Sequence, residues 1–405
     1  MTKVLISGAS IAGNALAAEL ARAGCAVTVV ERAPAIRPGG YAVDVRGVAL
    51  EVAERMGVAA EARRWQTDTE GTSFVDADGK RIATLPRGFG VLDPSDIEIM
   101  KGDFSGVLHE AVPPGVEWIF GDTVAALDQR GERVVVRLER GGVREFDYVA
   151  GCDGIHSRVR ALAFPGEHLH HLGSNTAVFT APNEFGVERW QLIHTMPGRV
   201  ISVKTDRDCQ ATQASSVPAQ SAGGGSRDVK VTLLYGGGMP PRDRAERVRS
   251  VEAAFAGAGW AGPRLLERLR AAPDLYVAPN AQVRLPGWTA GRVALVGDAG
   301  YAPSSLTGQG TGMALVGAYL LARHIVAGDD LREYDRELHE FVEVNQRAAL
   351  GAARGFAPKS ELAARMMSLS IRLLPYMPGR NLMFAAMTSQ ARKAANALIL
   401  PSAIS

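Results

Sequence analysis

Cysteine is scarce in this sequence of 405 residues, in which only Cys25, Cys152 and Cys209 occur, far apart from one another. No two of them form a C-x-x-C pair, which argues against a disulfide framework and against a cysteine-based metal site. Free thiols of this kind are typical of a reducing compartment. We therefore expect a cytoplasmic location and no bound metal ion.

Long hydrophobic runs are absent as well, since no stretch reaches the about 18 apolar residues that a membrane-spanning helix needs. Residues 1–6 indicate a strand and not the charged region and apolar segment of a signal peptide. The net charge is only +2, which provides no basic field for nucleic acid. We expect a monomer or homodimer that binds neither membranes nor nucleic acid.

The first thirty residues predict a strand, a tight turn, a helix and a second strand. Residues 3–7 and 26–31 are apolar without alternation, as in strands of a buried parallel sheet, and residues 11–23 have helical spacing. The turn between strand and helix carries Gly8-Ala9-Ser10-Ile11-Ala12-Gly13, a near match to the dinucleotide fingerprint G-x-G-x-x-G. Ser10, a small residue, replaces the middle glycine, where the backbone must approach a pyrophosphate.

A nucleotide at this turn would meet the positive end of the helix and an acidic residue on the second strand. Helix N-termini attract phosphate. Glu31 stands roughly 20 residues after the turn, where an acidic side chain is expected to bond a ribose hydroxyl and to repel a 2′-phosphate. This pattern predicts FAD or NAD bound by Gly8, Ser10, Ile11, Ala12, Gly13, Glu31 and Arg32.

Two later segments add to this unit. Residues 293–296 predict a buried strand, and Gly297-Asp298 follow at its C-terminal end, where open α/β sheets bind ligands. Residues 309–326 predict an apolar helix whose start is rich in glycine. Bare backbone N–H groups at such a helix start can face a flat ring and stabilise negative charge on it. A third segment, residues 152–160, begins with Cys152-Asp153-Gly154, which by itself is an ordinary turn.

Together, the turn at residues 8–13, residues 152–160 and residues 292–312 resemble the three motifs of FAD-dependent monooxygenases similar to para-hydroxybenzoate hydroxylase. Tetracycline-inactivating and polyketide-tailoring monooxygenases belong to the same group. The resemblance implies that Asp298 accepts a hydrogen bond from the ribityl chain, that Arg46 contacts the flavin, and that Asp153 lies near the cofactor or its nicotinamide donor. It extends the predicted cofactor site to Lys101, which stands where the family usually has arginine, and to Pro303, Gly308, Gln309, Gly310, Thr311 and Gly312. Tyr301 replaces a histidine that is frequent in the family.

The resemblance also implies the architecture, an α/β fold with a Rossmann-like FAD-binding domain of the glutathione-reductase type. We expect this domain to comprise residues 1–70, 95–172 and 281–330. A mixed β-sheet substrate domain would comprise residues 71–94 and 173–280, and residues 331–405 would be helical. Hairpins are expected over residues 71–85 and 134–150. Residues 210–226, which lack bulky apolar side chains, predict a surface loop without a catalytic role.

The implied activity is that of a monooxygenase with non-covalent FAD. NADPH or NADH would visit transiently, because only one dinucleotide fingerprint occurs, and O₂ would form a flavin C4a-hydroperoxide that oxygenates an aromatic or polyketide-like small molecule. The flavin carries this chemistry, so no catalytic side chain is assigned. Candidates for lining the substrate surface are Phe179, Trp190, Gln191, Leu192 and His194. An FAD-dependent reductase or dehydrogenase and a non-catalytic flavin-binding protein remain as alternatives.

Overall fold

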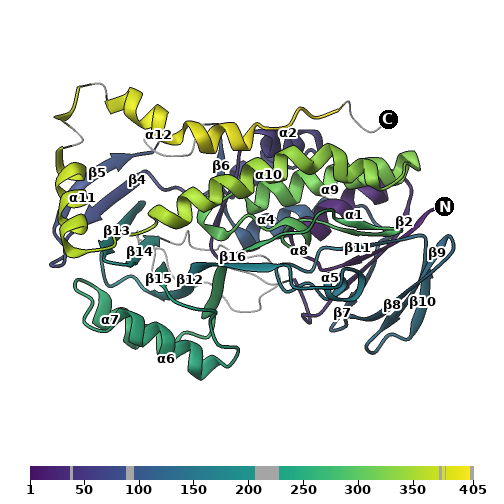
Figure 1. The fold of residues 1–405 in the computed structure, drawn as a ribbon, viewed down its shortest axis with the longest axis horizontal. Coiled ribbons are helices and arrows are strands. Elements are labelled where there is room, and N and C mark those ends of the chain that lie inside the picture. The colour runs from purple at the N-terminus through teal and green to yellow at the C-terminus, as the bar shows by residue number, and fades with distance from the viewer. Residues whose placement is uncertain (37–39, 88–94, 206–227, 374–375, 379, 402–405) are drawn as a thin grey trace.

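A parallel sheet forms the centre of the larger unit. The computed structural model describes residues 1–36, 40–87, 95–205, 228–373, 376–378 and 380–401 (Figure 1). The six-stranded sheet has the order β17-β18-β11-β1-β2-β7, and only β17 runs antiparallel to its neighbour. Its strands are β1 (Lys3–Ser7), β2 (Ala26–Glu31), β7 (Glu117–Phe120), β11 (Tyr148–Gly151), β17 (Thr289–Ala290) and β18 (Val293–Leu295). The predicted strand–turn–helix–strand unit and the predicted α/β fold are confirmed.

Helices cover this sheet and bring distant segments to the first turn. The helix α1 (Ile11–Arg22) packs against α4 (Lys101–Glu110) and α9 (Gly310–Ala327), and α9 also contacts α2 (Val48–Arg55). Smaller elements complete the unit, namely α3 (Ala59–Arg64), α5 (Arg158–Ala163), α8 (Asp298–Tyr301), the 3₁₀ turn η1 (Ser305–Thr307) and the two-stranded ribbon of β3 (Ala42–Val45) and β6 (Ile97–Met100). Apolar side chains of α3, α5, α8, β3 and β6 share one continuous core with the sheet.

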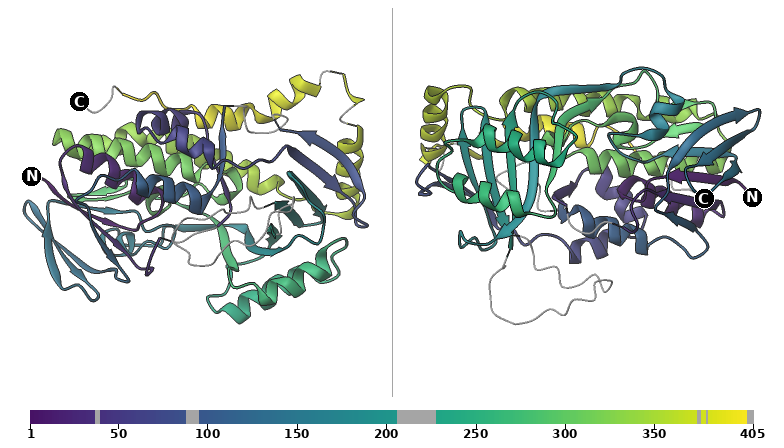
Figure 2. Two further views of the ribbon diagram at one scale, coloured as in Figure 1. Left: turned by 180° about the vertical axis from the view of Figure 1, so that it is seen from behind. Right: turned by 90° about the horizontal axis from the view of Figure 1, so that it is seen from below.

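A second, seven-stranded sheet lies beside this unit (Figures 1 and 2). Its order is β16-β12-β15-β14-β13-β4-β5, and β13 and β4 form its one parallel pair within the described residues. The strands are β4 (Gly71–Val75), β5 (Arg81–Pro86), β12 (Leu169–Pro182), β13 (Trp190–Met196), β14 (Arg199–Thr205), β15 (Asp228–Gly236) and β16 (Tyr276–Val283). Helices α6 (Arg244–Phe255) and α7 (Gly262–Ala271) cover one face and enclose a separate core.

Of the two predicted hairpins, one is confirmed and the other is partly wrong. Strands β4 and β5 pair as expected. The hairpin expected over residues 134–150 consists of β9 (Arg133–Leu138) and β10 (Val143–Phe146), which form a three-stranded sheet with β8 (Val124–Arg130). Tyr148–Gly151 leaves that hairpin and pairs with β1 in the parallel sheet. Apolar strands look alike in sequence, so the partner of each strand is decided by tertiary packing. Residues 210–226 lie outside the described residues.

The C-terminal region is helical, as predicted, with α10 (Arg332–Gly355), α11 (Glu361–Leu373) and α12 (Arg380–Ala395). The long helix α10 extends across the molecule and packs against both α9 and β12, so it joins the two units (Figure 1). Helix α11 lies against β5 and β13 at the far end of the seven-stranded sheet.

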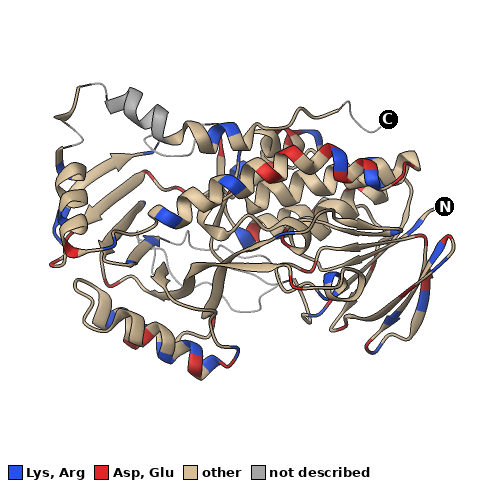
Figure 3. Cartoon of the chain, viewed as in Figure 1, with Lys and Arg blue, Asp and Glu red and all other residues tan. Residues whose placement is uncertain are grey.

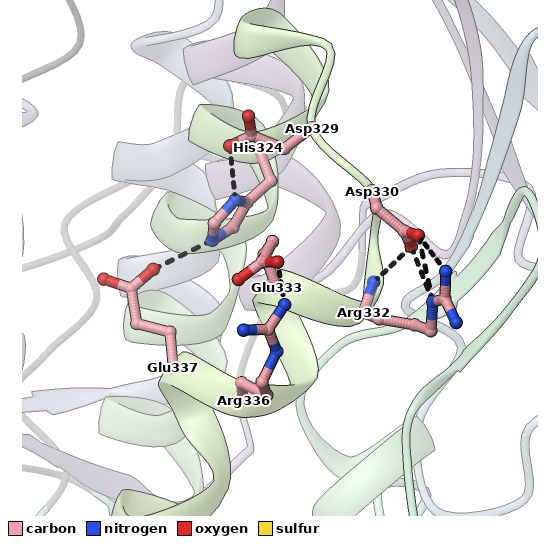
Figure 4. Close-up of polar contacts among 7 residues, drawn as sticks. All are labelled: His324, Asp329, Asp330, Arg332, Glu333, Arg336 and Glu337. Atoms are coloured by element: carbon pink, nitrogen blue, oxygen red, sulfur yellow. Dashed lines mark hydrogen bonds and ion pairs between the residues drawn. The ribbon is translucent and has the colours of Figure 1, made fainter.

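The C-terminal end of α9 is held by a buried histidine between two carboxylates. His324 Nδ1 lies 2.8 Å from Asp329 Oδ2, and His324 Nε2 lies 2.8 Å from Glu337 Oε2 of α10 (Figure 4). Both ring nitrogens thus lie within hydrogen-bond distance of a carboxylate, and the contact with Glu337 ties the end of α9 to α10. The cluster therefore anchors the helix whose N-terminus carries the glycines of residues 308–312.

Within the described ranges, α9 is the one helix long and apolar enough to cross a membrane, and 78% of it is buried inside the protein. That degree of burial marks α9 as a core helix.

Across the same part of the chain, no group of three or more His, Cys, Asp or Glu side chains is arranged to hold a metal ion.

Candidate active site

The glycines of the first turn are required by close backbone contacts. Gly8 has a φ of +107°, and a Cβ there would lie 2.5 Å from the carbonyl oxygen of Cys152 at the end of β11. A Cβ on Gly13 would lie 1.8 Å from the Gly8 oxygen. Ser10 precedes α1 without a side-chain capping bond. No side chain of Ser10 therefore occupies the backbone N–H groups at the start of α1, and these groups can bind an anion, as the fingerprint predicts.

Glu31 lies at the same turn. Its carboxylate accepts hydrogen bonds from the backbone N–H of Ala9, at 2.9 Å, and of Ala33, at 2.8 Å. These bonds hold the acidic group beside residues 8–13, while the neighbouring Arg32 is exposed. The arrangement suits a ribose at the turn, and the contact of Glu31 and Arg32 with a nucleotide stays a prediction.

Asp298 reaches the same region from the end of β18, which lies two strands away from β1 in the six-stranded sheet. It begins α8 directly after Gly297, whose φ of +65° lets β18 turn sharply. A Cβ on Gly297 would lie 3.1 Å from Ala314 Cβ of α9 and 3.4 Å from Ala12 Cβ of α1, so three elements converge here. Burial raises the pKa of the Asp298 carboxyl, and the charge of Lys101 opposes that shift.

Lys101 lies beside a pair of tyrosines that sequence reasoning missed. The Lys101 ammonium lies 5.7 Å from the centroid of the Tyr41 ring. Tyr41 in turn stacks on Tyr276 of β16, with centroids 6.4 Å apart and an interplanar angle of 27°. Burial raises the pKa of Tyr41, and Asp298 raises it further. Tyr41 stands in the loop that carries Arg46 and could have been noticed there, whereas Tyr276 belongs to the other sheet and gives no local signal.

The other end of the site carries unsatisfied donors. Arg46 is only 4% exposed, and its Nη2 donates to the Thr307 carbonyl at 2.5 Å. Among the described residues, its Nε and Nη1 have no hydrogen-bond partner, and neither has Nε2 of the buried Gln309. A buried donor without a partner costs about 1–3 kcal/mol. These donors therefore fit a ligand that presents acceptor atoms, as the carbonyl and ring-nitrogen edge of a flavin does.

The glycines of residues 308–312 close this end of the site. Gly308 is left-handed, with a φ of +67°, and a Cβ on it would lie 2.7 Å from Asp44 Oδ2 and 3.5 Å from Arg46 Nη2. A Cβ on Gly310 would lie 3.4 Å from Asp298 Oδ1. The structure thus brings Arg46, Asp298 and the start of α9 together.

The loop before these glycines is strained. Ser304 has a φ of +106° although it carries a side chain, a conformation that costs on the order of 1–3 kcal/mol. The preceding Pro303 is buried, and its carbonyl accepts a hydrogen bond from Gln282 Nε2 at 3.1 Å. Thr311, in the first turn of α9, is buried as well. Strain of this kind collects at binding sites, and sequence reasoning did not identify Ser304.

Two carboxylates face each other next to Arg46. Asp44 on β3 is the direct cross-strand partner of Glu98 on β6. Glu98 Oε2 lies 2.6 Å from the Lys204 ammonium of β14 and also accepts from Thr67 Oγ1 at 2.5 Å. Burial, together with the nearby charge of Glu98, raises the pKa of Asp44 to about 6, although Arg46 lowers it. The site therefore includes a carboxyl that titrates close to neutral pH.

Lys204 also shows which face of the seven-stranded sheet is turned toward this site. Its cross-strand partner Gln191 lies on the same face, where Gln191 Nε2 donates to Ser202 Oγ at 2.8 Å. Side chains alternate between faces along a strand, so Trp190, Leu192 and His194 point to the other side. Phe179 is fully buried in the core with α6 and α7. Of the five candidate substrate residues, only Gln191 is placed on the facing side, and the prediction for Phe179 is wrong.

Asp153 is engaged in the protein itself. Its carboxylate accepts hydrogen bonds from Ser157 Oγ at 2.5 Å and from the backbone N–H groups of Arg158 and Val159 at 2.7 and 3.1 Å. Ser157 is the N-cap of α5 and accepts from the Arg160 N–H at 2.9 Å. Asp153 thus orients α5 at the end of β11, and its contact with a cofactor stays a prediction.

Tyr301 has a structural role, since its hydroxyl lies 2.9 Å from that of Tyr334 in the core.

Comparison with known proteins agrees with this geometry. A family described as FAD binding domain matches residues 1–343. An uncharacterized protein of Mycobacterium tuberculosis is 41% identical over 373 residues, which cover 88% of this chain and 95% of the relative. A flavin-dependent monooxygenase of Legionella longbeachae is 31% identical over 369 residues, which cover 89% of this chain and 91% of the relative. The crystal structure of tetracycline destructase Tet(51) has a TM-score of 0.82 and 28% identity, with 99% of this chain and 100% of that chain covered.

Proposed function

The chain belongs to the FAD-binding domain family, among flavin-dependent monooxygenases, and we propose that it uses NADPH or NADH and O₂ to hydroxylate an aromatic or polycyclic small molecule. The set of buried donors without partners carries this proposal: Arg46 Nε, Arg46 Nη1 and Gln309 Nε2, beside the left-handed Gly308. They complement acceptor atoms on one edge of a flat ring, whereas an ADP moiety alone needs only the first turn and Glu31.

Residues of this chain would hold FAD along its whole length. The turn of Gly8 and Gly13 would receive the pyrophosphate, Glu31 the adenosine ribose, and Asp298 the ribityl hydroxyls. Lys101, next to Asp298, would add a positive charge beside the same stretch. At the ring end, Arg46 and the N–H groups at the start of α9 would provide positive potential. When bound, the flavin supplies the redox and oxygen-transfer chemistry of the reaction.

The substrate would lie between this ring end and the seven-stranded sheet. The facing side of the sheet presents Gln191, Ser202 and Lys204, of which Lys204 is paired with Glu98 of the FAD-binding unit. Tyr276 connects the same sheet to Tyr41. Two contacts thus connect the sheet to the FAD-binding unit, on the face of the sheet that carries both aromatic and hydrogen-bonding groups. Such a surface suits a flat substrate with hydroxyl or carbonyl groups. The likeness to a tetracycline destructase supports a small-molecule substrate.

Oxidation of NADPH and NADH by the FAD-loaded protein, measured with a panel of hydroxylated polycyclic compounds, tests the proposal. We expect a substrate that accelerates nicotinamide oxidation and a product that gains one oxygen atom. That atom should carry the label when ¹⁸O₂ is supplied and should be unlabelled when only the water is labelled.

Other results would replace the proposal with a different one. Nicotinamide oxidation with a reduced product and no labelled oxygen would indicate an FAD-dependent reductase. Bound FAD that neither nicotinamide reduces under any substrate would indicate a flavin-binding protein without this activity. Asp298→Ala serves as a negative control, since it should lose FAD and turnover together.

A further inference from the structure

The solvent-facing side of α11 is apolar, the reverse of an ordinary surface helix. Leu362, Met366, Leu369 and Leu373 are 69%, 62%, 58% and 51% exposed. Their spacing of four, three and four residues places them in one stripe along the helix. The opposite side of the helix holds the buried Ala364, which is the side that packs on the protein. Single exposed leucines are common, but a continuous stripe of this kind marks an interaction surface.

The stripe lies where nothing else in the described part of the chain covers it. Helix α11 forms the outer edge of the molecule at one end of its long axis, in all three views (Figures 1 and 2). Beyond the helix, Tyr376 and Met377 are 83% and 44% exposed, so the apolar surface continues past its C-terminus. This surface is distant in the fold from the turn at residues 8–13 and from α9, so it is separate from the proposed active site.

The charges around the stripe are mainly positive. Between residues 351 and 373 the exposed basic residues are Arg354, Lys359, Arg365 and Arg372, and the one acid is Glu361. A second acid comes from the neighbouring sheet, where Asp76 Oδ2 lies 4.0 Å from Arg372 Nη2. Arg365 and Arg372 are seven residues apart and therefore lie on the same flank of the stripe. Figure 3 shows basic residues at this end of the molecule, with acidic residues among them. An apolar stripe with a cationic flank and a tyrosine at its end is the composition of a helix that lies in the surface of an anionic bilayer.

A second copy of the chain would match this surface less well. The spacing of the stripe also suits the seam between two packed helices. However, an antiparallel two-fold pairing that places Leu362 opposite Leu373 would bring Arg372 of one copy near both Arg365 and Glu361 of the other, so like and unlike charges would meet there. Phosphate headgroups, by contrast, would offer only opposite charge to both guanidinium groups.

We propose that α11 docks the protein on anionic lipid surfaces, with its leucine and methionine stripe in the headgroup boundary and Arg365 and Arg372 on lipid phosphates. This is a peripheral contact and involves no spanning segment. The proposal does not depend on the proposed reaction, because no residue of α11 belongs to the FAD site. It departs from the expectation from sequence that the protein has no membrane partner, an expectation that considered spanning segments alone.

Co-sedimentation of the FAD-loaded full chain with vesicles tests this docking. The vesicles consist of phosphatidylcholine alone or with phosphatidylglycerol, at low and at high salt. We expect binding to the anionic vesicles that weakens with salt. Arg365→Gln with Arg372→Gln should weaken that binding about tenfold and leave the weak binding to neutral vesicles unchanged. Leu362→Ser with Leu369→Ser should abolish binding to both kinds of vesicle.

Controls separate lipid binding from folding and from self-association. Met239→Ser changes another exposed apolar side chain, 52% exposed, and should leave vesicle binding unchanged. FAD content and melting temperature should be equal in all variants, because the changed side chains are exposed. Light scattering after gel filtration reports the mass in solution. A dimer that Leu362→Ser with Leu369→Ser dissociates, or vesicle binding that the serine variants do not reduce, or no binding to anionic vesicles at low salt, would each overturn the proposal.

Discussion

Replacing Arg46 by methionine should weaken the binding of FAD strongly without destabilising the cofactor-free protein. In the protein without cofactor, Arg46 makes one hydrogen bond, to the Thr307 carbonyl, and keeps two buried donors that have no partner among the described residues. Methionine has a similar length and no donors. The substitution therefore removes one favourable contact and two unfavourable ones.

The magnitudes favour a gain in stability for the cofactor-free protein. A hydrogen bond from a charged group contributes about 1.5–3 kcal/mol, and each unsatisfied buried donor costs about 1–3 kcal/mol, so the two together cost about 2–6 kcal/mol. The free energy of unfolding of Arg46→Met should therefore lie between about 1 kcal/mol below and about 4.5 kcal/mol above that of the unchanged protein. Asp44 Oδ2 lies 3.8 Å from Arg46 Nη1 and loses this counter-charge, so the same change is also measured in an Asp44→Asn background.

The affinity for FAD should fall strongly. If the two free donors bond the flavin, their loss removes about 3 kcal/mol or more, which is at least about a 100-fold rise in Kd. Urea unfolding of the cofactor-free protein provides the stability, and quenching of flavin fluorescence on titration provides the Kd.

Arg160→Met is the matched control. Arg160 is also a buried arginine, 9% exposed, but its Nη1 and Nη2 donate to the carbonyls of Ala299 and Ile155, each at 2.7 Å. Its replacement should cost about 3 kcal/mol of stability or more. If Arg46→Met is as destabilising as Arg160→Met and leaves the Kd for FAD unchanged, Arg46 is a structural residue and the reasoning is refuted.

Three further predictions follow from other parts of the site. Glu31→Ala should weaken FAD binding by about 1.5–3 kcal/mol in the same titration while the cofactor-free protein still unfolds cooperatively; an unchanged Kd would limit Glu31 to its bonds with the turn. Asp44 has its pKa raised to about 6, so the folded state holds this proton more tightly than the unfolded chain. Its contribution to stability is present below about pH 4 and is lost as the pH rises through 6, by up to about 3 kcal/mol, and urea unfolding of Asp44→Asn between these pH values should lack that loss. Gly8→Ala should destabilise the protein by more than about 2 kcal/mol in thermal unfolding, because its Cβ would lie 2.5 Å from the Cys152 oxygen at a positive φ, and a neutral result would contradict the close approach of β11.

The sequence by itself determined the features whose physical causes are local. Gly8 and Gly13 are required by a turn and a helix within a few residues of one another, and this requirement is visible in the spacing. The apolar strands β1 and β2 on either side place Glu31 at the turn for the same reason. The order of the three motifs and the family resemblance supplied the fold and FAD, since each motif lies at the end of a predicted strand.

Tertiary structure alone decided which distant side chains meet. Alternation along β13 and β14 defines two faces of a sheet, but only the ion pair of Lys204 with Glu98 shows which face is turned toward the site. The stacking of Tyr276 on Tyr41 likewise joins residues more than two hundred positions apart. Whether the donors of Arg46 have partners depends on every neighbouring element, so no local pattern records it. A stripe such as that of α11 is the usual sign of a buried helix face, and only the packing of Ala364 on the other side left it in solvent.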